Sequence, residues 1–187
     1  MIDWDQIVDR DGPAVWRACW RLLGNRADAD EAFQEAFVAA YELSKRQVLG
    51  SPRAVLQHLA TARSIDKLRA RQRHRKRHEP VDDERLNEES AGDPSPRQHA
   101  EAAELRGELR QALTALPGRQ AEAFVLHAIE GWAYTEIAER LGLTVDHVGV
   151  LIHRARAKLK VSLGHFARAK EPGAGDGPSG RAARSTR

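Results

Sequence analysis

The sequence has one cysteine, Cys19, and only ten aromatic side chains among its 187 residues. A single thiol excludes an internal disulfide and a zinc site built from several cysteine ligands. So few aromatic residues in a chain of this length favour small helical cores over one large core. The length itself suits one ordinary domain or two small ones.

Long apolar runs are absent as well. No stretch approaches the roughly 18 apolar residues that a membrane-spanning helix needs, and the mean hydropathy is −0.59. The first residues include Asp3, Asp5, Asp9 and Asp11 and lack the positive-then-apolar order of a secretion signal. We therefore expect no membrane insertion and a cytoplasmic location.

Patterns that would indicate strands or catalytic groups are also missing. No segment shows a convincing strand alternation, so the expected fold class is all-α. We find no nucleophile with a base and an orienting group, no glycine-rich phosphate loop and no paired carboxylates at a catalytic spacing. The chain is therefore expected not to be an enzyme, and to hold no metal and no cofactor.

Charge is distributed in blocks, although the net charge is only +3. Residues 63–77 contain eight Lys or Arg and one acid, whereas residues 81–104 contain eight acids and two bases. Residues 105–170 carry ten bases and six acids. Two positive modules joined by a negative connector indicate a nucleic-acid partner.

The N-terminal module is expected to span residues 1–77 and to hold at least three helices. The first is predicted to start at Asp11-Gly12-Pro13 and to end at Gly24-Asn25. The second is predicted from near Ala27, with a core stripe of Phe33, Phe37 and Tyr41 beside four alanines. The third is predicted to open at Ser51-Pro52 and to run into the basic block.

The remaining chain divides into a linker, a second module and a tail. Residues 78–101 are rich in acids and contain three prolines and one glycine, which predicts an acidic flexible linker. Residues 102–168 are predicted to form a helical C-terminal module. The composition of residues 169–187 predicts a disordered tail.

The strongest local pattern lies between Tyr134 and Arg156. A short helix with one apolar face is followed by Gly142, which permits a tight turn, and by Thr144, which can cap a second helix. This spacing is typical of a helix-turn-helix unit, whose second helix enters the major groove of DNA. An ordinary helical hairpin is the alternative.

Two stretches resemble the extracytoplasmic-function (ECF) group of bacterial RNA polymerase sigma factors, in the sigma-70 family. Asp28-Ala-Asp-Glu-Ala-Phe-Gln-Glu-Ala-Phe37 resembles the pattern of region 2. Residues 115–117, 130–131, 136–139 and 153–156 resemble region 4. Together they cover roughly residues 10 to 165 in the expected order. The resemblance implies a sigma factor that directs core RNA polymerase to specific promoters for transcription initiation.

The resemblance also implies partners and site residues. The partners are core RNA polymerase, promoter DNA and, in some members, an anti-sigma factor. The polymerase-binding residues are expected to be Asp30, Glu31, Gln34 and Glu35. The DNA-binding residues are expected to be Arg63, Lys67, Arg69, Arg71, Thr144, Asp146, His147, Val150, His153, Arg154 and Arg156.

Four positions depart from the family pattern. Val55 stands where many members have tryptophan, and Ala62 where asparagine is common, which weakens the expectation of promoter opening. Gly149 and Leu151 stand where members often carry lysine and arginine.

The main alternative function is a stand-alone helix-turn-helix regulator that binds an operator as a dimer. An enzyme with an appended helix-turn-helix is a third interpretation.

Overall fold

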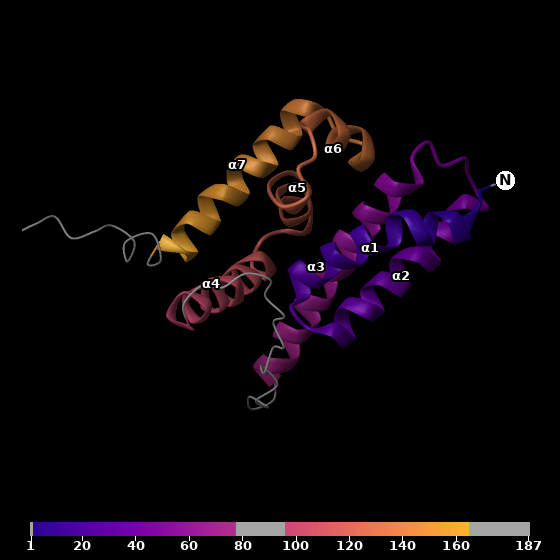
Figure 1. The fold of residues 1–187 in the computed structure, drawn as a ribbon. Coiled ribbons are helices and arrows are strands. Elements are labelled where there is room, and N and C mark those ends of the chain that lie inside the picture. Colours follow the sequence, from indigo (N-terminus) through magenta and orange to yellow (C-terminus); the bar gives the residue numbers. More distant parts are fainter. Residues whose placement is uncertain (1, 78–95, 165–187) are drawn as a thin grey trace, which may run out of the picture.

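The computed structural model describes residues 2–77 and 96–164, and every regular element among them is a helix. The expected all-α fold is confirmed. The N-terminal module contains α1 (Trp4–Leu23), α2 (Arg26–Ser44) and α3 (Pro52–Arg77). The C-terminal module contains α4 (Pro96–Thr114), α5 (Gly118–Ala128), α6 (Tyr134–Leu141) and α7 (Val145–Ser162). Figure 1 shows α1, α2 and α3 as a bundle and α4 to α7 as a second group.

The start of α1 differs from the prediction. The helix begins at Trp4, where the Asp3 side chain accepts a hydrogen bond from the Gln6 backbone, and Pro13 lies inside it. Proline lacks the N–H that would continue the helical ladder, so the Gly-Pro pair suggested a start. The helix continues through it because residues on both sides, Ile7 and Val15, are buried in one core.

The core face of α2 is made of alanine and not of aromatic residues. Ala29, Ala32, Ala36 and Ala40 are fully buried, and their small side chains allow close packing on α1 and α3. Phe33 and Phe37 flank this stripe and are partly buried. Tyr41 was predicted in the core but is 47% exposed, in a T-shaped contact with the Trp4 ring and with the Lys45 ammonium over its own ring.

The third helix extends through the whole basic tract to Arg77. Its apolar face, which includes Val55, Leu56 and Ala60, joins residues of α1 such as Val15 and Leu23 in the first core cluster. Val55 is therefore a core residue, 1% exposed, and cannot stack on a base in this arrangement. Ala62 is half-buried.

Helix α4 begins at Pro96, within the range predicted as linker and before the predicted start of the C-terminal module at Ala102. Proline is well suited to the first turn of a helix, where its missing N–H has no helical partner to lose. The rest of the predicted linker, residues 78–95, and the predicted tail lie outside the described residues. Within the described ranges, no helix is long and apolar enough to cross a membrane.

Two further core clusters stabilise the C-terminal module. One lies between α5, α6 and α7 and includes Leu126, Ile137 and Ile152. The other combines Leu113 and other residues of α4, α5 and α7 with two residues of the N-terminal module, Leu22 and Ile65. The two modules therefore share part of their apolar core.

Candidate nucleic-acid and protein interfaces

The helix-turn-helix has capped ends on both sides of its turn. Gly142 has a φ of +65°, in the left-handed region, and ends α6 there. The Leu143 N–H donates to the Ala138 carbonyl, 2.9 Å away. The Thr144 hydroxyl then accepts a hydrogen bond of 3.2 Å from the His147 N–H and opens α7. These are the roles that the sequence predicted for both residues.

The buried face of α7 leaves the predicted base-reading residues outside. Val148, Leu151, Ile152, Ala155 and Leu159 are buried. The residues predicted to contact DNA on this element are all exposed, namely Thr144, Asp146, His147, Val150, His153, Arg154 and Arg156. Leu151 departs from the family pattern because it is a core residue here, only 7% exposed. Gly149 lies next to the Tyr134 ring and is half-buried.

The exposed bases of α7 are not neutralised by their surroundings. Among the described residues, no carboxylate lies within ion-pair distance of Arg154 or Arg156. Lys158 and Lys160 are also exposed, each four residues after one of these arginines. Such cations can contact phosphates without breaking an existing ion pair.

The predicted polymerase-binding acids lie on one helix face but contact other parts of the chain. Glu31 and Glu35 both reach Lys67 of α3, at 2.9 and 3.1 Å. Asp30 accepts a hydrogen bond of 2.7 Å from the Trp16 indole and lies 3.6 Å from Arg26. Gln34 is exposed on the same helix.

Two of the predicted DNA-binding bases of α3, Lys67 and Arg63, are partners of those acids. Lys67 has a side chain only 16% exposed. Burial lowers its pKa, but the hydrogen bonds that its ammonium donates to Glu31 and Glu35 outweigh burial and leave the pKa above its ordinary value. Arg63 lies 3.8 Å from Glu35, and Arg71 lies 3.3 Å from Asp28.

The structure thus brings together the acids of α2 and the bases of α3, which sequence reasoning assigned to separate surfaces. The sequence does hold a pattern that indicates this pairing. Acids at 31 and 35 and bases at 63 and 67 repeat with the same four-residue spacing. Two helices that pack side by side can align such ladders and pair them. The roles of both sets toward polymerase and DNA stay predictions.

Arg69 faces the C-terminal module. Its Nη2 donates to the Leu116 carbonyl over 2.7 Å, and its Nη1 lies 4.0 Å from Asp66. Sequence reasoning missed this contact and also a pair formed by Arg21 and Glu130, 2.7 Å apart. These are contacts between modules, and no local sequence pattern predicts which residues of two separate bundles will meet.

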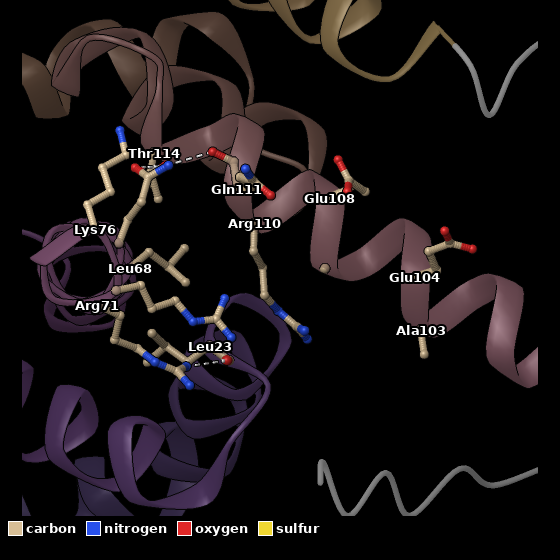
Figure 2. A pocket seen from close by; sticks show the side chains of 13 residues that line it. Leu23, Leu68, Arg71, Lys76, Ala103, Glu104, Glu108, Arg110, Gln111 and Thr114 are labelled. Atoms are coloured by element: carbon tan, nitrogen blue, oxygen red, sulfur yellow. Dashed lines mark hydrogen bonds between the residues drawn. The ribbon is translucent and has the colours of Figure 1, made fainter. Parts of the chain in front are cut away.

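A cavity of about 570 Å³ lies between α3 and α4. Figure 2 shows Arg71 and Arg110 reaching toward Leu23 at one side of it, and Glu104 and Glu108 on α4. Its lining holds no grouping that suggests catalysis. Among the residues described, no three histidine, cysteine or carboxylate side chains gather where they could hold a metal ion.

Comparison with known proteins identifies both modules. Residues 7–74 match the family model "Sigma-70 region 2", and residues 106–159 match "Sigma-70, region 4". The chain is 34% identical over 160 residues to the ECF RNA polymerase sigma factor SigE of Mycolicibacterium smegmatis. That match covers 86% of this chain and 61% of SigE, so the chain spans less than two thirds of that relative.

Two other matches cover more of the known protein. ECF RNA polymerase sigma factor SigW of Bacillus subtilis is 28% identical, with 84% of this chain and 87% of SigW covered. The crystal structure of the sigma factor RpoE with the anti-sigma factor NepR from Bartonella quintana shares the fold. Its TM-score is 0.55 at 21% identity, covering 87% of this chain and 97% of that one. With regions 2 and 4 matched in order and the ECF sigma factors SigE and SigW similar over most of its length, the chain belongs to the ECF group of the sigma-70 family.

Proposed function

We propose that this protein is a promoter-specificity subunit that directs core RNA polymerase to particular promoters and starts transcription there. The observation that carries the proposal is the exposed side of α7. It combines a capped helix-turn-helix with two arginines, Arg154 and Arg156, that no described carboxylate neutralises. Family membership supports the dependence on core polymerase.

The C-terminal module is assigned the distal promoter element. His147, Val150 and His153 lie on the exposed side of α7, where side chains near the N-terminus of a recognition helix meet base edges. Arg154 and Arg156 follow on the same helix and suit phosphate contacts, which fix the position of the helix on the duplex.

The N-terminal module is assigned the polymerase and the proximal promoter element. Asp30, Glu31, Gln34 and Glu35 are proposed to contact the polymerase, and Glu31 is the most exposed of the three acids, at 61% for its side chain. Arg63, Lys67, Arg69 and Arg71 are proposed to contact DNA. Binding of either partner would compete with the ion pairs between α2 and α3, so the two binding events are coupled through these pairs.

The factor itself is proposed to catalyse no reaction and to act in the cytoplasm together with the polymerase. An anti-sigma factor is a further proposed partner. The solved RpoE structure contains the anti-sigma factor NepR, and that chain has the fold described here.

The test is transcription in vitro with core polymerase and genomic promoter fragments. We expect specific transcripts only when this protein and core polymerase are both present. Binding of one specific DNA site by the protein alone, with no effect on transcript choice, would favour the stand-alone regulator instead. The variant Arg154→Ala,Arg156→Ala tests the assignment of α7 and should reduce transcripts without changing co-purification with the core.

A further inference from the structure

The exposed side of α7 has an apolar side chain at its centre, Val150, which is 44% exposed. We propose that Val150 contacts the methyl group of a thymine in the distal promoter element. Through this contact it distinguishes a T·A pair from a C·G pair at that position. The inference rests on the proposed function, because it concerns which chemical group of the DNA the recognition helix detects.

The helical repeat places Val150 at the centre of this exposed side. Its neighbours on the helix surface are the residues three and four positions away, and all of them are exposed, namely Asp146, His147, His153 and Arg154. The buried residues of α7 lie on the opposite side and pack on α5 and α6. Figure 1 shows α7 at the edge of the molecule, with α5 between it and the N-terminal module. Val150 therefore faces away from the C-terminal module.

The first half of α7 lacks the side chains that usually identify a base through two hydrogen bonds. Residues 144–153 contain no arginine, lysine, asparagine or glutamine. Arginine and lysine pair with the two acceptors of guanine, and asparagine and glutamine pair with the donor and the acceptor of adenine. The Thr144 hydroxyl is already engaged as the helix cap, where it accepts the His147 N–H. This half of the helix must therefore identify bases in another way.

The polar side chains around Val150 do not separate A·T from G·C pairs by their simplest bonds. A neutral imidazole has one N–H donor, and the N7 atom of either purine accepts from it. His147 and His153 can thus separate a purine from a pyrimidine on one strand. The Asp146 carboxylate accepts from an amino group, and every base pair offers one in the major groove, from adenine or from cytosine. The choice between A·T and G·C is left to the apolar contact.

The charges on α7 place Val150 over base edges and not over phosphates. Asp146 precedes Val150 by about one helical turn, and a phosphate would repel its exposed carboxylate. Exposed cations lie on both sides of the line through Val150, with Arg154 and Lys158 on one side and Arg156 and Lys160 on the other. These cations can contact the two phosphate strands that border the groove. An apolar side chain between two rows of cations matches the major groove, whose floor holds the bases and whose edges hold the phosphates.

Thymine is the base that presents an apolar group in the major groove. Its C5 methyl marks a T·A pair, and cytosine has only a hydrogen at the same position. Contact with a valine side chain removes this methyl group from water, which favours binding. The usual energy of one buried CH₂ group corresponds to a change in affinity of about fourfold. Val150 therefore has the chemistry to distinguish T·A from C·G.

The test uses holoenzyme and a distal element that the parent protein selects from a randomised promoter library. Each thymine of that element, on either strand, is replaced in turn by deoxyuridine, which lacks only the methyl group. We expect one position at which deoxyuridine weakens binding of the parent by about fourfold. At that position, 5-methylcytosine paired with guanine should bind about fourfold more tightly than cytosine, because it carries the methyl group on a different base pair.

Two protein variants assign the methyl effects to a side chain. Val150→Ala should abolish both effects, because the shorter side chain no longer reaches the base, and it should keep its helicity because Val150 lies outside the core. The matched control is Val161→Ala, the same change at a valine that is 85% exposed near the C-terminal end of α7. Val161→Ala should retain both effects, because recognition helices contact bases through their N-terminal residues. Comparing each variant on both DNAs separates the contact from any general effect of uracil on the duplex.

Three results would overturn the inference. One is a selected element in which no position responds to removal of a methyl group. Another is a methyl effect that persists in Val150→Ala, and the third is an equal loss of the effect in Val161→Ala. Failure of the holoenzyme to select any element or to make specific transcripts would instead refute the proposed function. A selected element that is insensitive to thymine methyl groups would refute the inference and leave the proposed function intact.

Discussion

At the residue scale, the same side chain often serves the fold and the proposed function. Lys67 is the clearest case, since its ammonium is held by Glu31 and Glu35 while sequence reasoning assigned all three to external partners. The acids are half-buried or exposed, so a partner can still reach them. The proposed contacts with polymerase would therefore replace existing ion pairs and would not add to an unoccupied surface.

A first prediction concerns the acidic side of α2. We expect Glu31→Lys,Glu35→Lys to weaken association with core polymerase, because reversed charges repel a basic partner. The fold should also lose stability, by about 1 to 3 kcal/mol, because the reversed charges face Lys67, whose side chain is only 16% exposed. Co-purification with tagged core polymerase measures the loss.

The matched control is Glu42→Lys on the same helix. Glu42 pairs with Lys45 at 2.7 Å on the exposed surface and was not assigned to the polymerase contact. Equal loss of association in both variants would mean that α2 acts through its overall charge and would refute the assignment of Glu31 and Glu35.

A second prediction concerns Cys19. Burial raises the pKa of this thiol to about 11, well above its ordinary value. The folded protein therefore holds the proton more tightly than the unfolded chain, so stability from this group is full below about pH 9 and declines through pH 11. Over this pH range the free energy of unfolding should fall by roughly 2 to 3 kcal/mol.

Urea denaturation of the parent and of Cys19→Ala at several pH values measures this effect. The difference in unfolding free energy between the two proteins should shrink as the pH rises from 8 to about 11. A difference that stays constant over this range would show that the thiol titrates normally in the folded protein.

At the element scale, sequence predicted the helices best where both ends carry a local signal. Helix α7 begins after Thr144 and follows Gly142 as expected, because capping and the left-handed turn are encoded by single residues. The start of α1 was placed too late because Gly12-Pro13 normally breaks a helix, and burial of its flanking residues overrode that preference. In α2, the alanine face packs inward because neighbouring helices approach closely, which aromatic content alone did not indicate.

The residues of the candidate site were likewise predictable from the sequence where a local pattern determines them, and not where tertiary packing does. Exposure of His147 and His153 followed from the helical period of α7, which is a local property. The partners of Arg69, Arg110 and Arg21 did not follow from any period, because they depend on how two separately folded bundles meet.

A third prediction tests α7 as the reading helix. We expect His147→Ala or His153→Ala to change discrimination among upstream sequences by roughly 1 to 3 kcal/mol where the histidine contacts a base directly. Leu151→Asp should instead unfold the C-terminal module, because it buries a charge in the core. Circular dichroism separates these two outcomes.

Selection from a promoter library gives the specificity readout. If the His147→Ala,His153→Ala variant selects the same upstream consensus as the parent, neither histidine reads sequence. The reading role would then pass to Thr144, Asp146 or the shape of the DNA.

At the scale of the whole molecule, the positive charge falls into two groups that differ in their surroundings. The bases of α3 include Arg63 and Arg71, which face Glu35 and Asp28, whereas Arg154 and Arg156 of α7 have no described carboxylate within ion-pair distance. A base already paired with a carboxylate gains less from a phosphate, because it exchanges one anion for another. The two modules should therefore contribute unequally to the salt dependence of promoter binding.

The last prediction measures that inequality. For holoenzyme bound to promoter DNA, each phosphate contact contributes about −0.9 to the slope of log K against log salt. Replacing Arg154 and Arg156 by alanine should reduce the size of the slope by about 1 to 2 and weaken binding to all promoters about equally. Replacing Arg63 and Arg71 should change the slope by less, because Glu35 and Asp28 partly neutralise these bases before DNA arrives. Lys45→Ala, which removes a surface base paired with Glu42, is the control and should leave the slope unchanged. Equal slopes for the two double variants would show that the pairs of α3 are fully released when promoter DNA binds.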